Sequence, residues 1–61
     1  MSKNEVWDYL RGKWNKYNNE CFHGDDNMDF VDWLDEMNGS VHYGYKIGYN
    51  HIKMEHVLVQ V

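Results

Sequence analysis

The feature that most constrains the fold is a change in the spacing of apolar residues at Gly39. Before it, apolar residues recur every three or four positions, as on one side of an α-helix. These residues are Phe30, Trp33, Leu34 and Met37. After it, apolar and polar residues alternate, as on the two faces of a β-strand. We therefore predict a helix over Asn27–Asn38 and a strand over Val41–Tyr49.

The predicted second helix carries carboxylates on the side away from its apolar residues. The row comprises Asp25, Asp29, Asp32 and Glu36, with Asp35 beside it. Asp26 or Asn27 is expected to cap the first turn through a side-chain oxygen, and Gly39 to act as the C-cap. One side of this helix must be buried, and the other is an acidic surface.

A first helix is predicted over Lys3–Asn19. Ser2 and Glu5 have the spacing of a capping box, in which each side chain accepts a hydrogen bond from the other residue's backbone N–H. Apolar residues then follow the helical period on one face: Val6, Trp7, Leu10, Trp14, Tyr17 and, at its end, Cys21. The polar run of Asn18, Asn19 and Glu20 predicts fraying toward a loop near His23 and Gly24.

The strand over Val41–Tyr49 is expected to pair with a second strand over Ile52–Val61 through a tight turn at Asn50-His51. In this register Tyr49 faces Ile52, Ile47 faces Met54, Tyr43 faces Leu58 and Lys46 faces Glu55. It also places His56 and Gln60 on the buried face. A bulge near Glu55-His56, which turns the C-terminal valines inward, remains an alternative.

The expected fold class is α+β, with two helices followed by an antiparallel hairpin in one compact domain over residues 1–61. A chain of this length buries only about 60% of the surface that its unfolded form exposes, so large aromatic side chains must supply much of the core. We expect most of the Trp and Phe residues to be inside. The predicted helix–helix core comprises Trp7, Leu10, Trp14, Phe30, Trp33, Leu34 and Met37.

The composition limits the cellular compartment and the kind of partner that we expect. A single Cys excludes an intrachain disulfide, which favours a reducing cytoplasm. The sequence has no apolar run long enough for a signal peptide or a membrane span, so we expect a soluble protein without membrane contact. Ten acidic against six basic residues give a formal net charge of -4. This charge argues against direct nucleic-acid binding and favours a basic partner.

For four candidate activities, the sequence favours a structural role of the same residues. Asp25, Asn27, Asp29 and Glu36 match part of a calcium-loop pattern, but Phe30 stands where that loop needs Gly, so a solvated helix face is favoured. Cys21 and His23 form one close pair of candidate zinc ligands, whereas structural zinc sites use two. We therefore expect no metal and no cofactor.

The same thiol could act as a nucleophile with a histidine base, but so short a chain has little room for a catalytic cleft. We therefore expect Cys21 to be a buried or partly buried free thiol and the protein not to be an enzyme. Tyr43, Tyr45 and Tyr49 could stack nucleic-acid bases, but the surrounding basic residues are too few, and core packing is favoured.

Two functions remain. The leading expectation is a non-enzymatic protein-binding module, an inhibitor or adaptor, whose carboxylates Asp25, Asp29, Asp32, Asp35 and Glu36 engage a basic surface, including one that otherwise binds nucleic acid. In size and charge alone the chain is similar to small phage proteins that disable host nucleic-acid enzymes. The alternative is a structural homo-oligomer, such as a homodimer, that assembles through its C-terminal strand with Val57, Val59 and Val61 at the interface.

Overall fold

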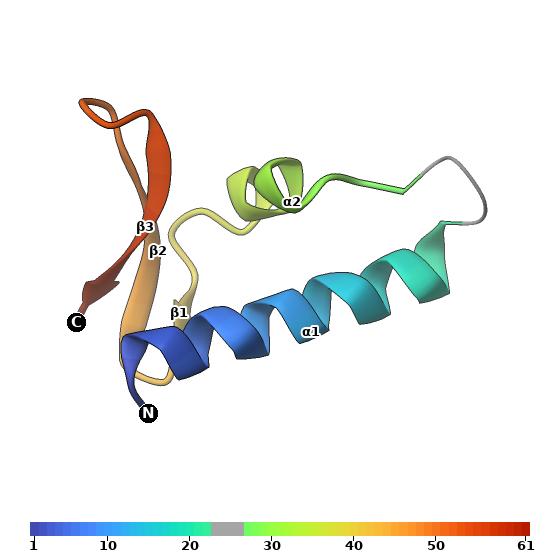
Figure 1. Ribbon diagram of the computed structural model, residues 1–61, viewed down its shortest axis with the longest axis horizontal. Helices are drawn as coiled ribbons and strands as arrows, with labels where there is room; N and C mark the ends of the chain where they lie inside the picture. Colours follow the sequence, from blue (N-terminus) through green and yellow to red (C-terminus); the bar gives the residue numbers. More distant parts are fainter. Residues whose placement is uncertain (23–26) are drawn as a thin grey trace.

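Two helices precede a three-stranded antiparallel sheet in the computed structural model of the chain, which describes residues 1–22 and 27–61 (Figure 1). The helices are α1 (Lys3–Cys21) and α2 (Phe30–Glu36). The strands are β1 (Val41–His42), β2 (Tyr45–Asn50) and β3 (Glu55–Gln60), in the spatial order β1-β2-β3. The predicted α+β class is confirmed, but the sheet has one strand more than the predicted hairpin.

The start of α1 follows the prediction. The Ser2 backbone N–H donates to the Glu5 carboxylate at 3.0 Å, and the Glu5 N–H donates to the Ser2 hydroxyl at 3.3 Å. This reciprocal pair satisfies two amides that lack a partner within the helix. The Ser2 backbone N–H, and after it the Ser2 side chain, stabilise the charged form of the Glu5 carboxylate and lower its pKa. The helix ends at Cys21, two residues later than predicted.

The end of α1 is held by hydrogen bonds as well as by half-buried aromatic contacts, such as that of Trp14 with Phe30. Asn18 is buried, and its amide exchanges two hydrogen bonds with the backbone of Met28, at 3.0 and 3.1 Å. The Trp14 indole N–H also donates to the Met28 carbonyl at 2.6 Å. The prediction that the polar run around Asn18 frays is therefore wrong at this residue, because its side chain pairs with a backbone segment ten residues away.

The second helix is shorter than predicted. Asp29 is its N-cap and makes no side-chain capping bond, so Asn27 lies outside the helix, while Asp26 lies outside the described residues. The helix ends at Glu36 with Met37 as its C-cap. Gly39 lies beyond the cap with φ +91°, and its N–H donates to the Ile47 carbonyl at 2.8 Å. Gly39 therefore joins the end of α2 to β2 instead of capping the helix itself.

The predicted strand over Val41–Tyr49 is interrupted by a turn at Tyr43-Gly44. His42 pairs with Tyr45, and both residues between them have positive φ, +50° and +81°, as in a type I′ turn. This conformation is unfavourable for Tyr43 by about 1 to 2 kcal/mol. The Tyr43 ring packs edge-on against Tyr9 of α1, with 4.9 Å between centroids, and this contact helps to offset the strain.

The β2–β3 connection also differs from the prediction. Asn50 pairs with Glu55 across a loop of four residues, 51–54, and its side-chain oxygen accepts from the N–H groups of Ile52 and Lys53. Positive φ falls on Met54, not on Asn50 or His51. The register is therefore shifted by four residues from the predicted one, with Ile47 opposite Leu58 and Lys46 opposite Val59.

Because that shift is an even number of residues, the side chains of β2 and β3 keep their predicted faces, whereas the turn at Tyr43-Gly44 puts Val41 on the face of Lys46 and His42 on that of Tyr45. Ile47, Tyr49, His56 and Leu58 thus lie on the face toward the helices, and the unbroken pairing from Tyr45 to Asn50 excludes the alternative bulge at Glu55-His56.

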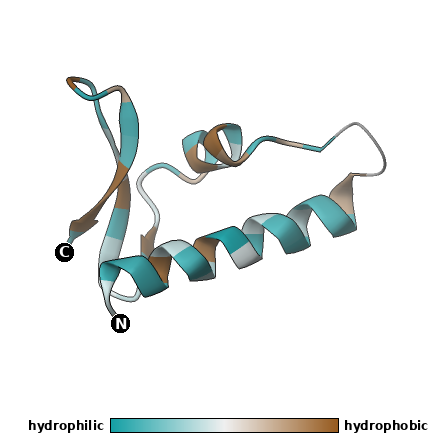
Figure 2. Cartoon of the chain, viewed as in Figure 1, coloured by the Kyte–Doolittle hydropathy of each residue, from teal (hydrophilic) through white to brown (hydrophobic). Residues whose placement is uncertain are grey.

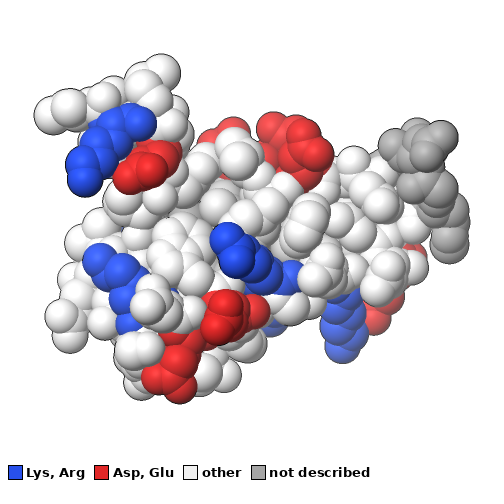
Figure 3. Space-filling model, viewed as in Figure 1, with Lys and Arg blue, Asp and Glu red and all other residues white. Residues whose placement is uncertain are grey.

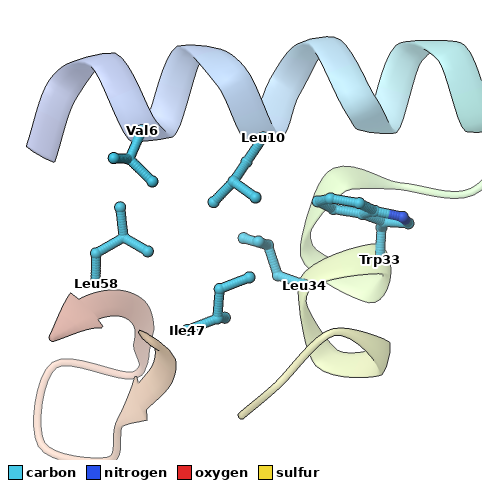
Figure 4. Packing of buried hydrophobic residues seen from close by; sticks show 6 residues of the cluster. All are labelled: Val6, Leu10, Trp33, Leu34, Ile47 and Leu58. Atoms are coloured by element: carbon cyan, nitrogen blue, oxygen red, sulfur yellow. The ribbon is translucent and has the colours of Figure 1, made fainter. Parts of the chain in front are cut away.

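The core lies where α1, α2 and the sheet meet. Six buried residues point toward one another in Figure 4: Val6, Leu10, Trp33, Leu34, Ile47 and Leu58. The other predicted helix residues, Trp7, Trp14, Phe30 and Met37, pack around this cluster but are only half-buried. The expectation that most Trp and Phe residues are inside is wrong, since only Trp33 is buried. Figure 2 shows the corresponding pattern, with hydrophobic positions in the first half of α1 and mostly hydrophilic turns beyond.

Candidate functional site

The exposed side of α2 is mainly acidic and includes one apolar residue, Val31. Trp33 and Leu34 face the core, and the helical period places Asp32, Asp35 and Glu36 on the opposite side, where all three are exposed. Asp29, the exposed N-cap, precedes them. We call these four residues the acidic arc; acidic side chains gather over α2 in Figure 3. Asp25, the fifth residue predicted for this surface, lies outside the described residues.

One member of the acidic arc has a partner in the sheet. His56 Nε2 of β3 donates to Asp35 Oδ1 at 2.7 Å, where the histidine side chain is 4% exposed and the aspartate side chain 61%. The Tyr49 ring packs edge-on against His56, with 5.0 Å between centroids. This pair explains how His56 occupies the inner face of the sheet, because its ring nitrogen is satisfied by a carboxylate at the surface.

The other arc carboxylates have no such partner. Within the described residues, no basic side chain lies within ion-pairing distance of Asp29, Asp32 or Glu36. Lys16 of α1 pairs instead with Glu20, at 4.0 Å between exposed side chains. The arc therefore presents three carboxylates that are free to accept hydrogen bonds from an incoming group.

A groove opens beside the acidic arc, between α1, α2 and the β2–β3 loop. Its volume is about 470 Å³. Its apolar lining is Trp7, Phe30, Val31, Leu34, Tyr49 and Met54, and its polar lining is Asn4, Asp8, Arg11, Glu55 and His56. Local sequence patterns do not predict this groove, because it joins residues from three elements. The only local signal was the aromatic content of the two helices.

A second hollow lies on the other side of α2. Its volume is about 400 Å³, and it is lined by Lys13, Lys16, Tyr17, Glu20, Trp33, Glu36 and Met37. Two lysines and two glutamates balance its charge, so it has no preference for a charged ligand of either sign.

The outer face of the sheet carries a strip of valines that the helices do not cover. The helices pack on the face that bears Ile47 and Leu58, and the opposite face carries Val57, Val59 and Val61. Val59 is 52% exposed and Val61 is 76% exposed, whereas Val57 is half-buried. These are the residues predicted for an oligomer interface, and the structure brings them together on one strand and its end.

The cysteine and histidine residues are dispersed in the described part of the chain. Cys21 is an exposed free thiol at the end of α1, so the expectation of a buried or partly buried thiol is wrong. His42 of β1 lies 2.9 Å from the Ser40 hydroxyl, and burial together with the charge of Lys13 lowers its pKa. Over residues 1–22 and 27–61, no three His, Cys, Asp or Glu side chains are grouped as a metal site requires.

No family model, curated protein or solved structure matches the chain. No helix among the described residues combines the length and the apolar character that a membrane crossing requires.

Proposed function

We propose that the protein is a non-enzymatic protein-binding module, an inhibitor or adaptor, that engages a basic surface of a partner protein through its acidic arc. The observation that carries this proposal is the arrangement of α2. Trp33 and Leu34 bury one side of the helix in the core, and the exposed residues of the helix are Val31 and the carboxylates Asp32, Asp35 and Glu36. Among the described residues, Asp32 and Glu36 form no ion pair with a basic side chain, and neither does the N-cap Asp29. A cationic surface complements such a display.

Folding alone does not account for this arrangement. Asp32 lies three residues before Asp35 and four before Glu36, and like charges at these spacings repel by about 0.2 to 0.5 kcal/mol per pair. Among these carboxylates, only that of Asp35 has a hydrogen bond to His56 in the described part of the chain. Asp32 lies in the first turn, where the helix dipole favours it, whereas Glu36 is in the last turn, where the dipole opposes it. The charge row is thus better explained by an external partner than by stability.

The length of α2 sets the scale of the contact. Seven residues of α-helix extend about 10 Å, since each residue adds about 1.5 Å. The carboxylates of the arc can therefore occupy a basic patch that otherwise holds a short run of phosphates. The proposal extends to small inhibitors of the phage type acting on such a surface. It includes a cytoplasmic setting, where a single exposed thiol stays reduced.

The test removes charge from the acidic arc without changing its shape. In the triple variant, Asp29→Asn, Asp32→Asn and Glu36→Gln, affinity for a partner captured from cell extract at low salt should fall, and its dependence on salt should become shallower. A control, Asn15→Lys, Asn19→Lys and Glu20→Gln, changes exposed residues of α1. Both variants raise the net charge by three, from -4. Equal losses in both variants, or no loss in the first, would refute a role for the arc.

A second candidate is a homo-oligomer that assembles through the outer face of the sheet. The exposure of Val59 and Val61 favours it, because a contiguous apolar strip on a sheet face is often covered by another chain. β3 is also an edge strand, which can pair with a copy of itself. Sedimentation should then give a mass that rises with concentration, and Val59→Lys should abolish that rise. A constant monomer mass up to millimolar concentration excludes this candidate.

A further inference from the structure

The groove between α1, α2 and the β2–β3 loop has the size and lining of a binding site. Its volume of about 470 Å³ lies within the range of about 300 to 1,000 Å³ that is usual for ligand pockets. Trp7 and Phe30 meet edge to face in its wall, with 6.3 Å between centroids. Val31 and Met54 contribute exposed apolar surface from opposite sides. An apolar side chain entering the groove would be enclosed by three elements.

The charge of the groove favours a cationic occupant. Asp8 of α1 and Glu55 of β3 lie on its walls, and Asp35 accepts the hydrogen bond of the lining His56. Arg11 is the only lysine or arginine in the lining. Its guanidinium carbon lies 5.7 Å from the centroid of the Phe30 ring, so this aromatic wall already stacks against a cation. Carboxylates therefore outnumber fixed positive charges around an aromatic centre.

Resting on the proposed function, we infer that this groove receives an apolar side chain of the basic partner, flanked by arginine or lysine. The apolar side chain fills the space between Phe30 and Met54, and the flanking cations reach Asp8, Glu55 and the acidic arc. The arc thereby attracts and orients the partner, while the groove supplies the buried anchor that interfaces need for affinity. An acidic segment or a nucleic-acid strand would meet these carboxylates with like charge.

The probe is an acetylated tripeptide of arginine, phenylalanine and arginine, titrated into the isotopically labelled protein and followed by NMR. The shifts should saturate and should be largest at the Trp7 indole and the amides of Val31 and His56. Two matched probes replace the arginines with glutamates or the phenylalanine with alanine. Each should bind at least about tenfold more weakly, because each lacks one of the two features that the groove recognises.

Two substitutions in the β2–β3 loop form a matched pair. Met54→Lys places a cation in the groove, whereas Ile52→Lys makes the same charge change two residues away, outside the lining. Both side chains are at the surface, with 72% of Met54 and 94% of Ile52 exposed, so neither change removes a core residue. We expect Met54→Lys to weaken the tripeptide at least about tenfold and Ile52→Lys to have less than about a twofold effect.

The outcomes separate this inference from the function on which it rests. Loss of tripeptide binding in Met54→Lys but not in Ile52→Lys supports the groove. Equal effects of the two substitutions, or shifts confined to the second hollow around Lys16 and Tyr17, overturn it. The inference is also overturned if the protein self-associates and Met54→Lys alone abolishes this, because the groove then receives a second copy of the chain. If the triple variant of the acidic arc loses the partner while Met54→Lys retains it, the proposed function stands and the groove assignment fails.

Discussion

The first half of α1 is held mainly by buried apolar side chains, whereas its second half combines hydrogen bonds with half-buried aromatic contacts. Val6 and Leu10 are fully buried against α2 and the sheet. At the other end the buried residue is Asn18, which together with Trp14 binds the backbone of Met28. Met28 lies directly before Asp29, the N-cap of α2. The two halves of α1 therefore hold α2 from different sides, by burial and by polar pairing, and together they position its acidic arc.

The largest expected effect is in the apolar core. Trp33→Ala removes a buried aromatic side chain and should lower the free energy of unfolding by about 3 to 5 kcal/mol, enough to unfold much of a domain this small. Val31→Ala on the exposed side of the same helix should change it by less than about 0.5 kcal/mol. Chemical denaturation followed by circular dichroism measures both. If Trp33→Ala still unfolded cooperatively with a stability near that of the parent, the apolar core would not be what holds the fold.

Loss of the hydrogen bonds at the end of α1 should lower the free energy of unfolding by less, and its effect should be more local. Asn18→Ala leaves the Met28 N–H without its side-chain acceptor and should cost about 1 to 3 kcal/mol. Asn19→Ala, at the exposed neighbouring position, is the matched control and should be nearly neutral. Hydrogen exchange at the Met28 amide gives the direct readout, since it should accelerate in the first variant alone. Unchanged exchange in Asn18→Ala would contradict the polar attachment.

The smallest expected effect is on the pH dependence of stability and comes from His42. Burial, followed by the charge of Lys13, holds the pKa of His42 below its ordinary value of 6.5. As the pH falls, His42 is therefore protonated in the unfolded chain before it is protonated in the folded chain. The stability that His42 contributes is complete above about pH 6.5 and is lost as the pH falls through the lowered pKa of the folded state. Unfolding titrations at pH 8 and pH 5 should show a smaller difference in His42→Gln than in the parent. If the stability difference between pH 8 and pH 5 were the same in both proteins, His42 would not be the source of the pH dependence.

The capping box and the acidic arc could be predicted from the sequence because each depends on residues within one or two helical turns. Ser2 and Glu5 are three apart, and the exposure of Asp32 follows from the burial of Trp33 and Leu34. The third strand was missed because Tyr43 adopts positive φ, which its residue type disfavours and a contact with Tyr9 from α1 supports.

Long-range pairing explains the remaining differences. The side chain of Asn50 binds two backbone amides in the loop, which lengthens the connection and shifts the register. Asp35 and His56 are 21 residues apart, and the groove joins α1, α2 and the hairpin, so neither leaves a periodic signal in the sequence. Asn18 looked like part of a fraying end because a buried amide is recognisable only when its backbone partner is known.

The most direct test of the proposed binding surface is to map the partner's footprint by cross-saturation NMR on the complex formed at low salt. We expect the amides of α2, including Asp32 and Glu36, and those of the β2–β3 loop to lose the most signal, and those of Val57 and Val59 to be unaffected. A footprint confined to Val57, Val59 and Val61, with no loss along α2, would contradict this expectation and would assign the contact to the outer face of the sheet.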